Sequence, residues 1–378
     1  MSRIVVLGSG IVGRAAAWDL LRRGHEVIVA DADPAVADGV ATELGAPDWR
    51  VTDASDRDGV RRLLEGADAV VSGVPYRFGM PVAEAAIATG CHYLDFGGNP
   101  TVVARQLELD EASRTAGVTL VPDCGLAPGV ANVMTLACVA QLGPGPIDTV
   151  GLRVGSLPAE PVGALNYQLS FNPVGLINEY AEPCEVLRDG RYTTVEPLTE
   201  IEEVTWPGVG TLEAFHTAGG SSSLTRLLEG RVRHLDYKTL RYPGHAVVFR
   251  SMLEIGLFDE AEQPIAGTAV APRGVLLDLL ERHLPRGGPD LVLVRIWATA
   301  ERDGEERTAG LQILDRNDGT FSALARTTAF PATALAHLLV TGAIDEPGAR
   351  TMDAAVTADD LLPELVSVGV VARPWPEG

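Results

Sequence analysis

The chain has 378 residues, more than the ~250–300 that usually share one core, so we expect at least two domains. Its 51 acidic and 30 basic residues give a net charge of −21, which argues against a nucleic acid or an anionic membrane as partner. The four cysteines show no Cys-x-x-Cys spacing, so we expect no metal site and no disulfide framework. With no signal-peptide pattern and no apolar run of ~18 residues, a cytoplasmic protein is expected.

The amino-terminal segment predicts a strand, a glycine turn and a helix. Residues Ile4–Leu7 are apolar and β-branched, as in a strand buried on both faces of a parallel sheet. Gly8, Gly10 and Gly13 follow at once. In this spacing Gly8 allows the tight turn, Gly10 lets the backbone approach a pyrophosphate, and Gly13 lets the helix lie close to the strand.

The helix that begins with Ile11 and Val12 points free N–H groups towards an anion. The next strand, 26–30, is followed by Asp31. A carboxylate here accepts hydrogen bonds from the ribose and repels a 2′-phosphate, so NAD is expected rather than NADP. A Rossmann-like unit that binds another nucleotide, or none, stays open as the alternative.

Strands and helices then alternate, which predicts a doubly wound parallel (Rossmann) sheet of about six strands. Because ligands bind at the carboxyl ends of such strands, residues at those ends are candidates for cofactor contact. Further strands are expected at 49–51, 69–74, 92–96 and 118–122, and helices at 36–44, 56–64, 81–89 and 101–116. The expected cofactor-binding residues are Gly8, Gly10, Ile11, Val12, Gly13, Asp31, Asp53, Ala54, Gly73 and Pro75.

Asp123 and Cys124 follow the sixth strand, where the crevice of such a sheet opens. Pro128 fits the first turn of a helix that continues to Val139, and Asp123 is alternatively a cap of that helix. The Gly-Pro-Gly-Pro segment 143–146 breaks the pattern and marks a domain boundary.

The remaining chain predicts an α+β domain with an antiparallel sheet. Strands are expected at 150–154, 165–171, 184–188, 247–252 and 290–299, with hairpin partners at 308–314 and 321–328 joined around 317–319, then helices at 331–340 and 361–368. We therefore expect a dinucleotide-binding domain at 1–145, a substrate and dimerisation domain at 146–328, and a return to the first domain at 329–378. A homodimer is the expected assembly.

Motifs along nearly the whole chain resemble the saccharopine dehydrogenase family, and within it the bacterial lysine 6-dehydrogenases. These motifs lie at 8–13, 93–98, 122–129, 153–158, 169–175, 212–220 and 238–245. Saccharopine-forming members tend to carry Asn-Arg-Asp-Ser where this chain has His-Thr-Ala-Gly at 216–219. The change removes an arginine suited to a second substrate carboxylate, which favours the lysine dehydrogenase branch.

The resemblance implies NAD-dependent deamination of the ε-amine of L-lysine, or of a close relative, to the semialdehyde and piperideine-6-carboxylate. Two other functions stay open. One is a saccharopine-type oxidoreductase that forms or cleaves a secondary amine between two acids. The other is a nucleotide-sensing protein without catalysis.

Oxidation of an amine needs a proton acceptor, because free lysine has a pKa of ~10.4 and only the neutral amine releases a hydride. The candidate acceptors are His216 and then His245, each alternatively an ordinary loop or surface histidine. Asp123 is expected to stabilise the cationic iminium, and Arg241 to hold the α-carboxylate in two hydrogen bonds unless it makes a surface ion pair. Residues expected to border the amino-acid substrate are Cys124, which is alternatively an apolar filler, Tyr167, Thr217 and Lys238.

Overall fold

The computed structural model describes residues 1–376, and these divide into two compact units, which we describe separately. The first unit contains residues 1–137 and 325–372. The second contains residues 138–324 and the segment from Arg373 onward. The first boundary thus falls inside a helix, whereas the sequence places it at the glycine and proline residues 143–146.

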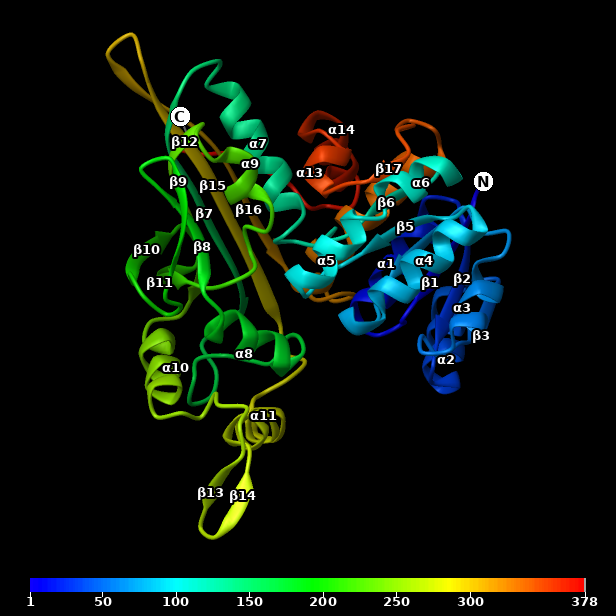
Figure 1. Cartoon of the computed structure of the whole chain (residues 1–378), viewed down its shortest axis with the longest axis horizontal. Coiled ribbons are helices and arrows are strands. Elements are labelled where there is room, and N and C mark those ends of the chain that lie inside the picture. The colour runs from blue at the N-terminus through cyan, green and yellow to red at the C-terminus, as the bar shows by residue number, and fades with distance from the viewer. Residues whose placement is uncertain (377–378) are drawn as a thin grey trace. The chain divides into compact units, whose positions relative to one another are not determined.

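In the described part of the first unit, seven parallel strands form one sheet, hereafter the parallel sheet. Its order is β17-β6-β5-β4-β1-β2-β3, so the expected doubly wound arrangement is confirmed (Figure 1). The strands are β1 (Arg3–Leu7), β2 (Glu26–Asp31), β3 (Asp48–Val51), β4 (Ala69–Ser72), β5 (His92–Asp95), β6 (Thr119–Val121) and β17 (Gly348–Ala349).

Helices connect these strands, and two of them differ from expectation. The helix expected at 101–116 is two helices that break at Glu108 and Leu109. The helix expected from Pro128 begins at Val130, because Gly129 has φ +129° and is not helical. The helices are α1 (Ile11–Arg22), α2 (Pro34–Leu44), α3 (Arg57–Leu64), η1 (Tyr76–Phe78), α4 (Gly79–Thr89), α5 (Pro100–Leu107), α6 (Asp110–Ala116), α7 (Val130–Gln141), α12 (Ala323–Val340), α13 (Met352–Ala355) and α14 (Ala358–Val366).

The chain after α12 completes the first unit. β17 pairs with β6 in the parallel sheet. The hydroxyl of Thr333 donates to Asp19 Oδ2 at 2.6 Å, and Arg23 binds both Asp19 and Glu364. The carboxylate of Asp19 is completely buried, and it is stabilised by Thr333 of α12 and by Arg23, which directly follows α1.

Among the described residues, α12 alone is long and apolar enough to span a membrane by length and composition. The sequence predicted no apolar run of this length. In this helix 78% of the residues are buried inside the protein, as in the core helix of a globular domain.

The second unit is built on a sheet of nine strands within residues 1–376, hereafter the mixed sheet. Its main path is β10-β11-β12-β7-β15-β16-β18, with β8 and β9 added at β12. The expected α+β fold is confirmed, but β12 and β7 run parallel within the otherwise antiparallel sheet. The strands are β7 (Ile147–Pro158), β8 (Cys184–Arg188), β9 (Arg191–Val195), β10 (Glu202–Trp206), β11 (Gly210–His216), β12 (Val232–Arg241), β15 (Asp290–Arg302), β16 (Glu305–Arg316) and β18 (Arg373–Pro374).

Several elements of this unit were predicted wrongly. Residues 165–171 are irregular, and 247–252 lie in a helix although Val247 and Val248 are β-branched. The long hairpin turns at Asp303-Gly304, both with positive φ, and not around 317–319. Residues 321–328 enter a helix whose first N–H groups, of Ala323 and Leu324, donate to the buried Asp290 carboxylate.

The two faces of the mixed sheet carry different cores. One core holds Leu157, Trp206, Leu212, Leu240 and Leu293. The other core lies under the helices that gather at one end of the sheet (Figure 1) and includes Tyr167, Tyr180, Phe215 and Phe249. These helices are α8 (Pro173–Ala181), α10 (His245–Glu254) and α11 (Pro272–His283); α9 (Leu224–Leu228) and the hairpin β13 (Gln263–Ile265) and β14 (Thr268–Val270) complete the unit.

The glycine turn after β1 has the expected geometry. Gly8 has φ +92°, and a Cβ there would lie 2.8 Å from the carbonyl carbon of Gly73. A Cβ on Gly13 would lie 1.9 Å from the Gly8 carbonyl oxygen, so only glycine allows α1 to approach the turn. A Cβ on Gly10 would meet no atom within 4 Å, so the space above this residue is open.

We predict that Gly13→Ala lowers the free energy of unfolding by about 1–3 kcal/mol, because the new methyl group overpacks the turn. Gly39→Ala is the matched control, since Gly39 lies in α2 with no atom within 4 Å of a built Cβ. This control should gain up to about 1 kcal/mol from the higher helix propensity of alanine. Urea denaturation measures both, and equal stability of the two variants would contradict the prediction.

Candidate functional site

The carboxyl ends of β1 and β2 hold an acidic residue against the glycine turn. The backbone N–H of Ser9 donates to Asp31 Oδ2 at 2.7 Å, and that of Asp33 donates to Oδ1 at 3.0 Å. A carboxylate offers about four lone-pair positions, so Asp31 keeps acceptor capacity for hydroxyl donors of a ligand. Beside it, Gly10 is exposed and Ile11 exposes 68% of its surface at the start of α1.

The end of β3 lies next to this acid. The N–H of Thr52 donates to the Asp31 carbonyl oxygen at 2.9 Å. Asp53 is exposed, and its hydrogen bond from the Ser55 N–H lowers the pKa of the Asp53 carboxyl. Ala54 is buried. The structure therefore brings Asp53 and Ala54 to the edge that carries Asp31.

The same edge continues past β4 and β5. Gly73 contacts Gly8, and Pro75 precedes the short helix η1. A small cavity of about 60 Å³ is lined by Ser72, Gly73, Val74, Tyr76, Gly79, Tyr93, Asp95, Phe96 and Gly97. An open space over Gly10, hydrogen-bond acceptors on Asp31 and a neighbouring hollow fit a dinucleotide.

A buried carboxylate organises the loops after β5 and β6. Asp95 Oδ2 accepts hydrogen bonds from the Tyr93 hydroxyl at 2.6 Å and from Gln106 Nε2 at 2.8 Å. Its Oδ1 accepts from the backbone N–H groups of Gly97 at 2.8 Å and Asp123 at 3.0 Å. Asp95 thus fixes the position of Asp123, although Asp95 was not among the site residues predicted from the sequence.

Asp123 lies at the carboxyl end of β6, is buried and has φ +58°. A Cβ on Gly97 would lie only 1.7 Å from Asp123 Oδ1, so this glycine leaves room for the carboxylate. The following helix begins at Val130, too far along the chain for Asp123 to be its cap. Cys124 is fully buried, its Sγ donates to the Val121 carbonyl oxygen at 3.0 Å, and burial raises the pKa of the thiol. It is a packing residue.

In the second unit, Arg241 is a buried guanidinium at the end of β12. Its Nε donates to the Tyr180 hydroxyl at 3.1 Å, and its Nη1 to the carbonyl oxygens of Leu240 at 3.0 Å and Ser156 at 3.4 Å. The guanidinium carbon lies 5.1 Å from the centre of the Tyr167 ring. With Nε and Nη1 engaged, Nη2 is the part of Arg241 available to a ligand.

His245 is held in one protonation state. Its Nδ1 lies 3.1 Å from the Leu165 carbonyl oxygen, which only accepts, so Nδ1 carries the proton. Its Nε2 therefore accepts from the Tyr180 hydroxyl at 3.0 Å. Burial, and then the Arg241 charge, lowers the pKa of His245 to about 3. His245 is not on the surface, and with both ring nitrogens engaged it does not fit the predicted role of proton acceptor.

His216 and Arg241 lie on opposite faces of the mixed sheet. In the β11–β12 register His216 pairs with Lys238, whereas Arg241 pairs with Glu213. Since side chains alternate between faces, Glu213 and Arg241 point away from the face that holds His216 and Lys238. The expectation that His216 and Arg241 act together on one small substrate is therefore wrong.

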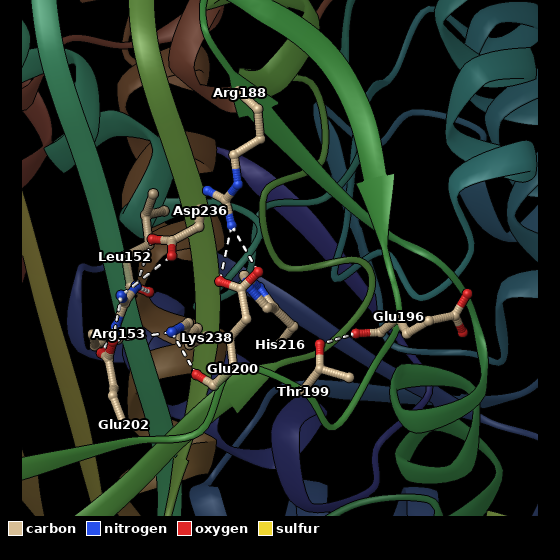
Figure 2. Close-up of polar contacts among 10 residues, drawn as sticks. All are labelled: Leu152, Arg153, Arg188, Glu196, Thr199, Glu200, Glu202, His216, Asp236 and Lys238. Atoms are coloured by element: carbon tan, nitrogen blue, oxygen red, sulfur yellow. Dashed lines mark hydrogen bonds and ion pairs between the residues drawn. The ribbon is translucent and has the colours of Figure 1, made fainter.

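Figure 2 shows the charged network on the His216 face. Arg153 donates through Nε to Glu202 and through Nη1 to Asp236 at 2.8 Å. Lys238 Nζ donates to Glu202 Oε2 at 3.0 Å and to the carbonyl oxygen of Glu200 at 2.7 Å. These contacts neutralise a buried arginine and a buried lysine, so Lys238 has a structural role there, not the predicted substrate contact.

His216 belongs to the same network. Its Nε2 lies 3.1 Å from Glu200 Oε2, and Arg188 Nη2 donates to that oxygen at 3.0 Å (Figure 2). The imidazole is completely buried. This environment couples the end of β11 to the segment before β10, and it leaves His216 far less accessible than a proton acceptor needs to be.

Thr217 and Tyr167 lie on the Arg241 face. The hydroxyls of Thr217 and Thr239 are 2.6 Å apart. Thr239 lies two residues before Arg241 on β12, so both side chains point to the same face of the sheet. In the turn that follows, a Cβ on Gly220 would lie 2.2 Å from the Tyr237 ring. Gly220 is thus required by packing.

Glu179 was not among the site residues predicted from the sequence. This half-buried residue lies on α8 beside Tyr180. Burial raises the pKa of its carboxyl to about 7, against the opposing effect of the Arg241 charge. The sequence does indicate a helix at 173–181, because Asn172 is a typical N-cap residue and Pro173 is typical of a first helical turn. This helix was not among those predicted.

Across residues 1–376, no group of three or more histidine, cysteine or acidic residues is arranged to hold a metal ion. The candidate site residues described above lie in two places. The carboxyl edge of the parallel sheet collects the glycine turn, Asp31 and Asp123. The Arg241 face of the mixed sheet, which α8 covers, holds Arg241, Tyr167, Thr217 and Glu179.

Two family models cover nearly the whole chain. The saccharopine dehydrogenase C-terminal domain matches residues 125–370, and the saccharopine dehydrogenase NADP binding domain matches residues 4–121. The chain belongs to the saccharopine dehydrogenase family. The amino-terminal match indicates a nicotinamide dinucleotide as the cofactor, in agreement with the edge that carries Asp31.

Curated relatives of this family member are longer than it is. A saccharopine dehydrogenase [NADP(+), L-glutamate-forming] of Pyricularia oryzae is 24% identical over 275 residues, which cover 71% of this chain and 60% of that protein. The mitochondrial alpha-aminoadipic semialdehyde synthase of Rattus norvegicus is 25% identical over 282 residues, which cover 69% of this chain and 29% of that protein. The chain thus spans about 60% or less of these relatives.

A solved structure shares the fold over the full length. The apo histidine-tagged saccharopine dehydrogenase (L-Glu forming) from Saccharomyces cerevisiae matches with a TM-score of 0.83, at 19% identity, over 99% of both chains. At this identity the match establishes the architecture.

We predict that His245 stays neutral down to about pH 4, because burial and the Arg241 charge hold its pKa near 3. In the unfolded chain its pKa returns to about 6.5, so this residue makes the protein less stable as pH falls from about 6.5 towards 3. Heteronuclear NMR of the imidazole, assigned by the loss of its signals in His245→Gln, measures the titration. A midpoint near 6.5 in the folded protein would contradict the prediction.

Proposed function

We propose that the chain is a nicotinamide-dependent oxidoreductase that removes the ε-amine of L-lysine or of a close relative. Membership of the saccharopine dehydrogenase family supports an oxidoreductase of amino-acid metabolism. The observation that supports an amino acid as substrate is the buried Arg241, because its remaining donor group Nη2 can bind an α-carboxylate. A buried guanidinium without an anionic partner costs free energy, so Arg241 favours substrates that carry a carboxylate.

When bound at the edge that carries Asp31, the cofactor supplies the acceptor for a hydride from the amine carbon. The glycine turn would hold the pyrophosphate, and Asp31 the ribose hydroxyls. Asp123 lies at the same edge, and we assign it the stabilisation of the positive charge that develops as the amine becomes an iminium. Water then converts the iminium into the aldehyde and ammonia.

We propose NAD as the cofactor, although the family model and the fungal relative carry NADP in their names. The support is local. Asp31 is the last residue of β2, and the next acid, Asp33, is the N-cap of α2. These two carboxylates would repel a 2′-phosphate, which needs a positively charged partner. In addition, Arg14 of α1 is already paired with Glu43 of α2.

The second candidate is a saccharopine-type oxidoreductase, which the names of the relatives favour. Against it stands Thr217, which occupies the position where saccharopine-forming members tend to carry arginine. Its hydroxyl is bonded to Thr239 on the Arg241 face and offers no positive charge to a second carboxylate. A nucleotide-sensing protein without catalysis is the third. Assembly as a homodimer and a cytoplasmic location stay predictions.

Turnover of a panel of amines tests this proposal. With NAD, L-lysine should produce NADH and ammonia, whereas cadaverine, which lacks the carboxylate, should have a kcat/KM lower by about 10- to 100-fold. The reduction is followed by NADH absorbance. Turnover of saccharopine without turnover of lysine would favour the second candidate, and cofactor binding without any turnover the third.

We predict that Asp31→Ser raises the ratio of kcat/KM with NADP to that with NAD by about tenfold, because it removes a charge that repels the 2′-phosphate. Asp38→Ser, at an exposed position of α2, is the matched control and should leave the ratio unchanged. Steady-state kinetics with both cofactors at one fixed amine concentration measure the ratio. A wild-type preference for NADP would show that the assignment of Asp31 is wrong.

A further inference from the structure

The proposed reaction needs a proton acceptor, and neither histidine predicted for this role is suitable. His245 uses both ring nitrogens in hydrogen bonds, and His216 lies in the network on the other face of the mixed sheet. The acceptor should lie on the Arg241 face, because Arg241 is the group that suits the carboxylate of the same amino acid.

Glu179 has the required placement on that face. Its neighbour in sequence, Tyr180, binds Arg241 Nε directly. The Glu179 carbonyl oxygen accepts from the Ala218 N–H at 2.9 Å, which ties α8 to the turn after β11. Its carboxylate makes no hydrogen bond or ion pair to any of residues 1–376, and the residue is half-buried and thus keeps some exposure to a ligand.

The groups around Glu179 come from each element packed against α8. β12 contributes Arg241 and Tyr237, the loop before α8 contributes Tyr167, and α8 itself contributes Tyr180. α10 contributes His245, which is neutral and bonded to Tyr180. α11 contributes Arg273, which is occupied by Asn178 and by Glu260. Arg241 is therefore the charged group that acts on Glu179 from this cluster.

We propose that the Glu179 carboxylate accepts the proton of the substrate ammonium, while Arg241 holds the α-carboxylate of the same molecule. This inference rests on the proposed function, since it needs an amine that is oxidised. It assigns the two ends of the amino acid to two charges of opposite sign on one face of the sheet.

The ammonium N–H bond breaks, and its proton binds Glu179, which leaves a neutral amine and a carboxylic acid. The C–H bond of the amine carbon then breaks, the hydride reduces the nicotinamide dinucleotide, and the nitrogen lone pair forms the C=N bond of the iminium. Addition of water releases ammonia and the aldehyde.

The protonation behaviour of the side chain agrees with this role. Burial raises the pKa of Glu179 to about 7, and Arg241 limits the rise. A base is most effective when its pKa lies near the working pH, so that it is partly ionised and still basic enough to take a proton. An exposed glutamate with a pKa of ~4.3 would be a much weaker acceptor.

The pH dependence of Glu179→Gln tests the proposal. Wild-type kcat/KM for the amine should fall about tenfold per pH unit below pH 7, as the base becomes protonated. Glu179→Gln should lose this break, be lower by at least about 100-fold at pH 7, and rise steadily towards the substrate pKa of ~10.4. Glu179→Asp should keep the break at a reduced rate. The exposed Glu182→Gln at the end of α8 is the control and should match wild type.

A second measurement does not depend on activity. Between about pH 4.5 and 7 the folded state binds more protons at Glu179 than the unfolded state, so this residue makes the protein less stable as pH rises through that window. Glu179→Gln should therefore gain stability over wild type at pH 8 and not at pH 4.5 in urea denaturation, whereas Glu182→Gln should not show this difference.

The outcomes separate the two proposals. If wild type oxidises an amine and Glu179→Gln keeps both the rate and the break near pH 7, the assignment of Glu179 is overturned while the proposed function stands. If wild type oxidises no amine with either cofactor, the proposed function fails and the assignment fails with it. Unchanged NADH binding in Glu179→Gln, measured by fluorescence, shows that a loss of rate is not a loss of fold.

Discussion

The alternation of side chains across the mixed sheet is the constraint on which the site depends. Because β11 and β12 pair with Glu213 opposite Arg241 and His216 opposite Lys238, these ionisable side chains are divided between two faces. A shift of the register by one residue would exchange the faces. The buried apolar residues Phe215 and Leu212 of β11 resist such a shift, since each fills a different core.

The two faces treat buried charge differently. On the His216 face, Arg153 and Lys238 are matched by Glu202 and Asp236, which satisfies their donors and leaves little for a ligand. On the opposite face, Arg241 donates hydrogen bonds to the neutral oxygens of Tyr180, Ser156 and Leu240, and the nearby carboxylate of Glu179 makes no hydrogen bond to residues 1–376. Buried charges that are incompletely paired lower the stability of the folded protein. They are typical of a site in which the substrate supplies the missing partner.

The parallel sheet shows how local sequence determines local chemistry. Gly13 is required by its close approach to the Gly8 carbonyl oxygen in the same turn, and Gly8 by its φ of +92°, so their spacing alone was sufficient to predict them. Asp31 could be placed because it directly follows a buried strand. Asp95 could not be assigned a role, because its four donors come from Tyr93, Gly97, Gln106 and Asp123, which converge only when β5, β6 and α5 pack together.

The sequence by itself determined the alternating strands and helices of the first unit, the glycine turn and the acid at the end of β2, since each depends on neighbours within about twenty residues. It did not determine the second unit, where Val247 and Val248 have strand propensity and yet lie in a helix, and where the hairpin turns at Asp303-Gly304. Only the tertiary structure decided which ionisable groups share a face. Glu179, Arg241 and His245 come from three separate elements, and their burial and pKa values are properties of the packed cluster and not of any one segment.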